Sequence, residues 1–352
     1  MLNPDRVELV RRRLGLTKIG FAKALGVDRK TIQRFESGKT EPNSGFLPKL
    51  CALSGYPEKF FEKGDFDYPN PDGVSFRSLR SLSASTRDSA LAIGALAFEF
   101  DDWVTAKFGL PDHSIPKINH HRPVEAAAAL RAHWGIGERP VGNMINLLET
   151  HGVRVFSLME ETRHLDAYSF WRHDKAYVFL NTVKTPEHSR FDAAHELGHL
   201  VMHHHTGSAH KSAEDEAHAF ASAFLMPPAD LLARMPVVRS FKSLLEGKKR
   251  WRVSAAALNY ALHKVGVISD WSYRGYYIEL NKLGRGNEPD GTEPETSQVW
   301  RKILTDLWRG GTPLSKIADE LAVPEKELSS LLFGVAASPT EHFSGGPLRL
   351  VT

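Results

Sequence analysis

The sequence of 352 residues contains only one cysteine, Cys51. One thiol cannot form an intrachain disulfide, which excludes a disulfide-stabilised secreted fold and indicates a reducing compartment. The chain also has no apolar run of about 18 residues, and its first residues are polar. We therefore expect neither a membrane helix nor a secretory signal peptide, and we predict a cytoplasmic protein with no membrane partner.

The net charge of the chain is only +3, but the charge is unevenly distributed. Residues 1–50 hold eleven Lys and Arg against five Asp and Glu, a local charge of +6, so the remaining residues sum to −3. A basic segment on a near-neutral body favours a polyanionic partner for that segment, most simply nucleic acid. The length allows two or three domains, and the apolar content of 41% is ordinary for a folded protein.

Residues 1–67 are predicted to form five short helices, two of which have clear start and stop signals. Thr17 can cap the first of these two, and Gly26 can end it in the left-handed conformation that glycine adopts most easily. Asp28 can then cap the second helix, whose N-terminal end is basic. Two helices joined by a tight glycine turn indicate a helix-turn-helix unit. The apolar positions expected to face inward are Phe21, Ala22, Leu25, Ile32 and Phe35.

Residues 4–65 as a whole resemble an XRE/Cro-type repressor domain, including the stretch Glu36–Pro42 after the second helix. The resemblance implies a double-stranded DNA operator as partner, bound by a homodimer because each chain carries one such domain. The alternative is a solvated, charged helix face without DNA contacts. The resemblance places four residues at the major groove or its flanking phosphates, without showing which of them reads a base: Arg29, Lys30, Gln33 and Arg34. It places three more near the DNA backbone: Thr17, Lys18 and Lys39.

The most informative motif is His-Glu-x-x-His at residues 195–199. On an α-helix His195 and His199 lie one turn apart on the same face, so both imidazoles can bind one metal ion. Glu196 then lies beside the metal, where peptide hydrolysis needs a general base. The apolar residues on both sides of the motif suit a buried site. The alternative is a surface helix in which the spacing is accidental.

A zinc hydrolase usually holds its metal through three protein side chains and leaves the fourth position for water. We expect the second helical run, residues 214–221, to supply the third ligand, and the spacing alone leaves four candidates open. His203 continues the stripe of His195 and His199, but a fourth histidine ligand would close the site and leave Glu196 without a role. The candidates are Glu214, Asp215, Glu216 and His218.

The two helical runs resemble the ImmA/IrrE family of metallopeptidases, whose second helix carries a Glu-Ala-Asn motif and ends in Leu-Leu-Met-Pro. The chain has Glu216-Ala217-His218 and then Phe224-Leu225-Met226-Pro227. The resemblance implies a zinc-dependent peptidase with Glu216 as the third ligand. His218 replaces the common asparagine of the family, so a contact around the metal is expected to differ. His203 and His218 are expected to line the pocket or to support the metal ligands.

Alternating residues predict a strand at 152–158, and two further strands are predicted at 166–170 and 175–180, joined by a turn at residues 172–174, before the helix of the His-Glu-x-x-His motif. A short sheet beside a ligand-bearing helix is typical of zinc peptidases, because an edge strand can hold an extended peptide near the metal. We predict a mainly α, α+β fold overall, with an all-α helix-turn-helix domain, an α+β zincin-like domain with a small sheet, and a helical C-terminal extension. The predicted boundaries are 1–67 for the DNA-binding domain, 68–115 for a helical linker, 116–285 for the metallopeptidase domain, and 286–352 for a polar linker, helix-turn-helix-like helices and a disordered tail.

Two further segments allow competing interpretations. Residues 313–324 resemble a second helix-turn-helix, but the helix that follows, 325–332, is acidic, which favours a packing or dimer role over DNA binding. Cys51 lies at helical spacing with apolar neighbours, which favours a small core residue over a thiol that blocks the zinc.

These features together predict a DNA-binding transcriptional regulator whose zinc-dependent endopeptidase cleaves a protein, either a repressor or the chain itself. One alternative is a transcription regulator whose peptidase-like domain senses a ligand without proteolysis. Another is an antitoxin or repressor that acts with a neighbouring toxin or mobile-element gene. The intact Glu196 favours the first interpretation, because a purely structural metal site has no use for a base.

Overall fold

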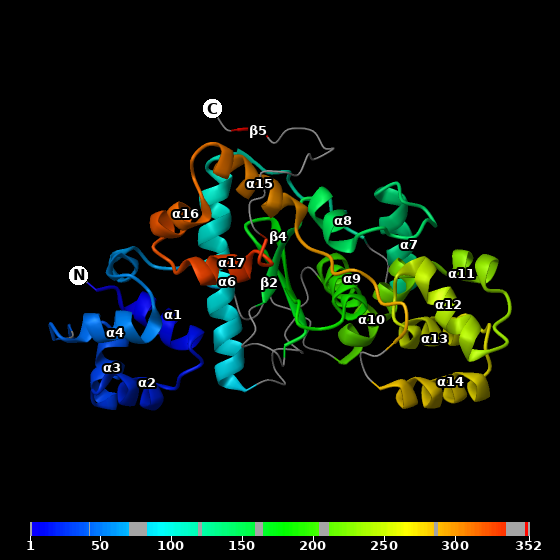
Figure 1. Ribbon diagram of the computed structural model, residues 1–352, viewed down its shortest axis with the longest axis horizontal. Helices are drawn as coiled ribbons and strands as arrows, with labels where there is room; N and C mark the ends of the chain where they lie inside the picture. Colours follow the sequence, from blue (N-terminus) through cyan, green and yellow to red (C-terminus); the bar gives the residue numbers. More distant parts are fainter. Residues whose placement is uncertain are drawn as a thin grey trace.

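The computed structural model describes residues 2–41, 43–69, 83–118, 122–158, 165–203, 211–284, 288–335 and 349–350. Short helices form one end of the elongated molecule and a second group of helices forms the other, with a long helix and a small sheet between them (Figure 1). The mainly α, α+β fold class predicted from the sequence is confirmed. Among the described residues, no helix is long and apolar enough to cross a membrane.

The N-terminal domain consists of five short helical segments whose ends are set by local capping. Thr17 Oγ1 accepts a hydrogen bond from Gly20 N at 3.1 Å, and Gly26 ends the same helix with φ 67°. Asp28 Oδ1 accepts a hydrogen bond from Lys30 N at 2.7 Å and starts the next helix. Side-chain caps and a left-handed glycine therefore define the helix-turn-helix, as predicted. The segments are α1 (Pro4–Arg13), α2 (Lys18–Leu25), α3 (Arg29–Glu36), α4 (Phe46–Ser54) and the 3-10 helix η1 (Glu58–Glu62).

The long helix α6 (Ala84–Thr105) joins the N-terminal domain to the rest of the molecule (Figure 1). Ala92 and Leu96 on one side of α6 are buried in the core of the N-terminal domain. Phe100 and its neighbours on another side belong to a second core, which α6 shares with the sheet. A helix that is apolar on two sides is stabilised by burial between two partners. Cys51 is half-buried against the N-terminal core, as expected of a small core residue.

The central sheet consists of β2 (Arg154–Leu158), β4 (Lys175–Asn181) and β3 (Ala167–Arg172), in that spatial order. β2 runs parallel to β4, and β3 runs antiparallel to it, as the first strand of a hairpin that β4 completes. The hairpin turns through His173 and Asp174, whose φ angles of 46° and 63° are those of a tight two-residue turn. Among the described residues β3 pairs only with β4, so β3 lies at one edge of the sheet.

Two helices pack together beside β3 and β4, and they carry the predicted metal ligands. They are α9 (Pro186–Met202), which contacts both strands, and α10 (Lys211–Leu225), which lies against α9. Leu197 of α9 and Phe220 of α10 are fully buried in the core that they share. The other helices of this half are α7 (Pro123–His133), α8 (Met144–Thr150), α11 (Pro228–Arg234), α12 (Phe241–Trp251), α13 (Ala255–Lys264) and α14 (Asp270–Leu283).

Residues 288–297 form an extended strap that crosses these helices and is held by carboxylates at helix N-termini. Glu288 Oε2 accepts a hydrogen bond from Ala255 N at 2.8 Å, at the start of α13. Glu295 Oε2 accepts one from Met144 N at 2.6 Å, at the start of α8. The first N–H groups of a helix lack partners within the helix, and they favour a negative charge. The segment predicted as a polar linker is therefore attached at defined points.

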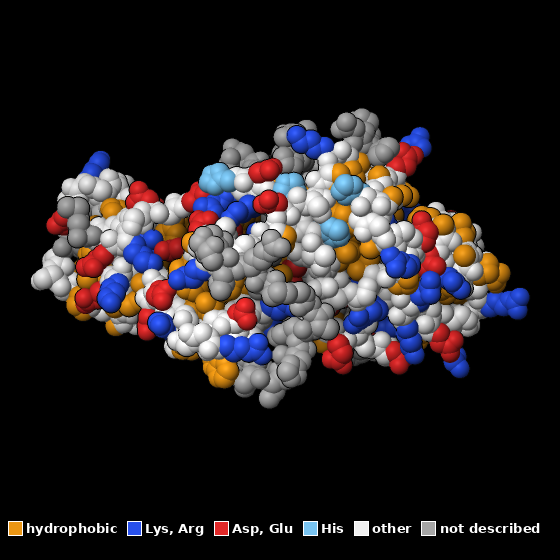
Figure 2. Space-filling view, turned by 90° about the horizontal axis from the view of Figure 1, so that it is seen from above, with side chains coloured by type: hydrophobic (Ala, Val, Ile, Leu, Met, Phe, Trp, Pro, Cys, Tyr) orange, Lys and Arg blue, Asp and Glu red, His pale blue; other side chains and the backbone are white. Residues whose placement is uncertain are grey.

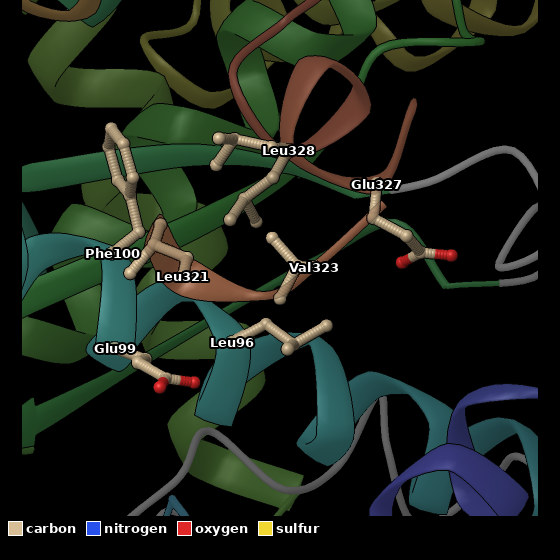
Figure 3. Close-up of a pocket in the computed structure, with 8 residues that line it drawn as sticks. Leu96, Glu99, Phe100, Leu321, Val323, Glu327 and Leu328 are labelled. Carbon is tan, nitrogen blue, oxygen red and sulfur yellow. The ribbon is translucent and has the colours of Figure 1, made fainter. Parts of the chain in front are cut away.

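The chain continues into α15 (Gln298–Arg309), α16 (Leu314–Leu321) and α17 (Glu325–Leu331). Phe100 of α6 and Leu328 of α17 line a small cavity at the seam between α6 and these C-terminal helices (Figure 3). The two-residue strand β5 (Arg349–Leu350) pairs with β1 (Phe108–Gly109). The other residues of the tail that the sequence predicts to be disordered, beyond Val335, lie outside the described residues.

Polar contacts attach the N-terminal domain to α6 and to the C-terminal helices. Arg13 Nε lies 2.8 Å from Glu327 Oε2 on α17. Lys63 Nζ donates a hydrogen bond to the carbonyl oxygen of Leu321 at 2.7 Å and lies 3.1 Å from Glu99 Oε1 on α6. The acidic helix after the second helix-turn-helix pattern therefore has a packing role, one of the two roles predicted for it.

Candidate metal centre and DNA interface

Local signals in the sequence position the two helices of the candidate metal centre. Thr185 Oγ1 accepts a hydrogen bond from His188 N at 3.4 Å at the start of α9, and Pro186 occupies the first turn. Gly198 lies inside the motif and allows α10 to approach closely, since a Cβ there would lie only 3.0 Å from Phe220 Cδ1. This close approach brings the first turn of α10 beside the histidines of α9.

The structure brings together, at this contact, three side chains that could hold a metal ion. Nitrogen and oxygen atoms of His195, His199 and Glu214 all lie within 4.8 Å of one another. The two Nε2 atoms of the histidines are 3.1 Å apart. The Glu214 carboxylate lies 3.3 Å from His195 Nε2 and 3.6 Å from His199 Nε2. Both imidazoles therefore present Nε2 to one point, and the carboxylate faces the same point from α10.

The donor set fits a zinc ion with one coordination position left for water. Glu214 Oε1 is buried and makes no hydrogen bond within the described part of the chain, as expected of an oxygen that faces a cation. Burial, together with the charges of His195 and His203, holds the pKa of His199 well below its ordinary value. His199 is therefore neutral at neutral pH, which is the form of imidazole that binds a metal.

Glu196 is buried on the sheet side of the same helix turn and contacts the edge strand. Its Oε2 accepts a hydrogen bond from Ser169 Oγ at 2.6 Å. Burial raises the pKa of Glu196 to about 7, although His195 and Ser169 both act to lower it. Sequence reasoning did not find Ser169, because a serine on a predicted strand carries no signal of its partner. The contact fixes the Glu196 carboxylate between the sheet and the metal-ligand cluster.

The other histidines of the region have different surroundings. His203, at the end of α9, has Nδ1 3.1 Å from His199 Nδ1, so it contacts one member of the cluster without joining the cluster itself. The ring of His218 packs between Phe191 and Tyr260, with ring centroids 4.9 and 5.2 Å away. The remaining histidines of the run after His203, residues 204, 205 and 210, lie outside the described residues.

The predicted DNA-contacting residues belong to α2 with its N-cap, to α3 and to the turn after α3, and all except the half-buried Lys18 are exposed. Four of them are on α3, and Lys39 follows α3 in the turn. Thr17 is engaged as the cap of α2, and Lys18 Nζ lies 2.7 Å from Glu36 Oε2. Figure 2 looks onto the side of this domain away from α2 and α3, where acidic and basic side chains alternate. The four predicted DNA-contacting residues of α3 are all exposed: Arg29, Lys30, Gln33 and Arg34.

Arg11 is a buried residue that sequence reasoning missed. Its Nε lies 2.5 Å from Glu36 Oε1, and its Nη1 donates a hydrogen bond to the carbonyl oxygen of Leu16 at 3.1 Å. Since Glu36 also pairs with Lys18, one network ties α1, α2 and α3 together. A buried ion pair of this kind fixes the orientation of α3, which carries the exposed basic residues.

Comparison with known proteins agrees with this division of the chain. Residues 7–61 match a helix-turn-helix family model, and residues 148–263 match the IrrE N-terminal-like domain of the M78 peptidases. The chain is an XRE-type helix-turn-helix domain fused to an ImmA/IrrE-like peptidase domain. The resemblance to both families seen in the sequence is confirmed. A search of curated proteins found no match.

Within the ImmA/IrrE-like domain, the structure differs from the assignment of Glu216 as the third metal ligand. Glu216 Oε2 lies 3.0 Å from His203 Nε2, whereas Glu214 is the acid beside His195 and His199. Residues two apart on an α-helix point in directions about 200° apart, so only one of these two acids can face the histidine pair. The structure therefore places Glu214 beside the histidine pair and Glu216, two positions later, beside His203.

Proposed function

We propose that this protein is a DNA-binding transcriptional regulator whose ImmA/IrrE-like domain is a zinc-dependent endopeptidase. The observation that carries the proposal is the meeting of His195, His199 and Glu214 at one point beside the buried Glu196. A structural metal site needs ligands only, whereas a hydrolytic site needs a carboxylate close enough to accept a proton.

His195, His199 and Glu214 would hold the zinc ion, which supplies Lewis-acid activation of water and of a peptide carbonyl. Glu196 is the general base in this scheme. Its pKa of about 7 matches a group that accepts a proton from water and passes it to the leaving amine near neutral pH. The Ser169 hydroxyl donates a hydrogen bond to the ionised carboxylate and holds it in place.

The position of β3 supports an extended protein segment as the substrate. β3 is an edge strand that contacts α9, and Ser169 on this strand touches Glu196 directly. A polypeptide that pairs with a sheet edge gains main-chain hydrogen bonds and lies extended. We propose a protein substrate, either a repressor or a second copy of this chain.

The N-terminal domain supplies the second half of the proposal. Arg29, Lys30, Gln33 and Arg34 are exposed on α3 while the domain is docked on α6, so the docked arrangement leaves them free to contact an operator. Such domains bind paired half-sites as dimers, and we propose a homodimer on a double-stranded operator in the cytoplasm. Arginine and glutamine side chains can read base edges, and lysines add contacts with phosphate.

The proposal is tested by incubating the zinc-loaded wild type, Glu196→Gln and a matched control, Glu246→Gln, with candidate substrates. The substrates are the protein alone and the DNA-binding proteins encoded beside its gene. We expect cleavage by the wild type and by the control, whose side chain is 63% exposed on α12, and no cleavage by Glu196→Gln. Equal behaviour of all three proteins, each with one bound zinc, would contradict peptidase action and favour a sensing domain.

A further inference from the structure

A hydrogen-bonded series of three side chains, His199, His203 and Glu216, leads outward from the candidate metal centre. His199 Nδ1 lies 3.1 Å from His203 Nδ1, on the far side of the ring from the Nε2 atom that faces the metal position. His203 Nε2 in turn lies 3.0 Å from Glu216 Oε2. This hydrogen-bonded series therefore links His199 on α9 to α10 through one histidine and one carboxylate.

While both imidazole rings are neutral, the protons of this hydrogen-bonded series can be placed in only one consistent way. His199 must keep Nε2 unprotonated to bind a metal, so its proton is on Nδ1 and is donated to His203 Nδ1. His203 then carries its own proton on Nε2 and donates it to Glu216 Oε2. Each donor meets one acceptor, and the last acceptor is a carboxylate, which forms the strongest bond of the series.

We propose that His203 and Glu216 are positioning residues that fix the tautomer and the ring orientation of His199 for metal binding. The inference rests on the proposed metal centre and assigns these two side chains a role that the peptidase chemistry alone does not require. Metal-binding histidines commonly donate their second ring N–H to a fixed acceptor, and loss of that acceptor weakens metal binding by about 10- to 100-fold.

Burial supports a specific role for this pair. The side chain of His203 is only 9% exposed, so its ring has little freedom to turn away from His199. The side chain of Glu216 is 39% exposed, so replacing it opens no cavity in the core. Variants at Glu216 are therefore expected to fold, which makes this residue the better one to change.

The test is the affinity of the purified, full-length apoprotein for zinc, measured by competition with a chelator of known affinity. We expect Glu216→Gln to raise the zinc Kd by about 10-fold and Glu216→Ala by up to about 100-fold, because an amide oxygen still accepts from His203 but carries no charge. We expect Glu214→Gln, which removes a direct ligand, to weaken zinc binding more than either. Glu246→Gln, whose side chain is exposed on α12, is the matched control and is expected to keep the wild-type Kd.

A second readout separates positioning from a general structural effect. Cobalt(II) bound at the site should keep the absorption intensity of a four-coordinate ion in Glu216→Gln, with shifted bands because His199 is reoriented, and should lose that intensity in Glu214→Gln. Combining His203→Phe with Glu216→Ala should weaken zinc binding no more than the larger of the two single substitutions does. Both changes interrupt the same hydrogen-bonded series.

The possible failures are distinguishable. A wild type that binds no zinc would overturn the metal centre and the proposed function with it. A wild type that binds one zinc, with an unchanged Kd in both Glu216 variants, would overturn only the positioning role. A severe loss of zinc affinity in Glu216→Gln, with near-normal affinity in Glu214→Gln, would show that Glu216 is itself the ligand. That result would also refute the positioning role.

Discussion

The substitution Glu149→Gln tests how burial and hydrogen bonding together set the pKa of a carboxylate that joins α8 to α15. Glu149 is 3% exposed at the end of α8. Its carboxylate accepts hydrogen bonds from Ser297 Oγ, from Gln298 N at 2.9 Å and from Val299 N at 3.2 Å, and so caps α15. These bonds favour the ionised form, but burial outweighs them and raises the pKa of Glu149 from 4.5 to about 7.

The sign of the effect follows from which state binds the proton more tightly. The folded protein keeps Glu149 protonated up to about pH 7, whereas the unfolded chain ionises it near pH 4.5. The stabilisation is therefore fully present below pH 4.5 and is lost as the pH rises through about 7. The difference between the two values corresponds to about 3 kcal/mol of unfolding free energy, of which about 2 to 3 kcal/mol falls between about pH 5 and 8.

The assay is denaturant unfolding of wild type, Glu149→Gln and the exposed control Glu293→Gln at several pH values between about 5 and 8. Other groups titrate in this range, so the informative quantity is the wild-type free energy minus that of Glu149→Gln at each pH. We expect this difference to fall by about 2 to 3 kcal/mol as the pH rises, and the Glu293→Gln difference to stay flat. A flat difference for Glu149, or one that rises with pH, would show that the three hydrogen bonds outweigh burial.

Three further predictions concern DNA binding and helix packing. The double substitution Arg29→Ala/Lys30→Ala is expected to abolish specific operator binding in a mobility-shift assay and to leave zinc content unchanged, and loss of both would contradict the separation of the two sites. Wild-type operator binding should also weaken steeply with added salt, because lysine and arginine release counterions from the phosphates. Gly198→Ala is expected to lower the unfolding free energy by about 1 kcal/mol and to weaken zinc binding, because the new Cβ crowds the Phe220 ring. Gly275→Ala, in α14 with no atom within 4 Å of the new Cβ, is the matched control and should instead stabilise by up to about 1 kcal/mol in the same denaturant titration.

Features with local causes were predictable from the sequence. Thr17, Gly26 and Asp28 determine where α2 ends and α3 begins, because caps act within one helical turn. That His195 and His199 lie on the same face of α9 follows from helix geometry alone. The same holds for the β3–β4 hairpin, whose strands and turn were predicted from short apolar runs and the turn residues between them.

Features that depend on how distant elements pack were not predictable. The choice between Glu214 and Glu216 depends on the rotation of α10 about its own axis against α9, which no spacing within α10 reveals. Ser169 is 27 residues from Glu196 along the chain, and Glu295 is about 150 residues from the α8 N–H groups that it caps. A polar residue on a strand or in a linker gives no indication of such a partner.

The central claim is tested most directly by one measurement on purified wild type and Glu196→Gln: metal content together with proteolysis of the protein itself and of neighbouring DNA-binding proteins. The account predicts one zinc per chain in both proteins and a cleavage product that only the wild type forms. Zinc in both without any cleavage would contradict the peptidase. Absence of zinc from both would contradict the metal centre itself.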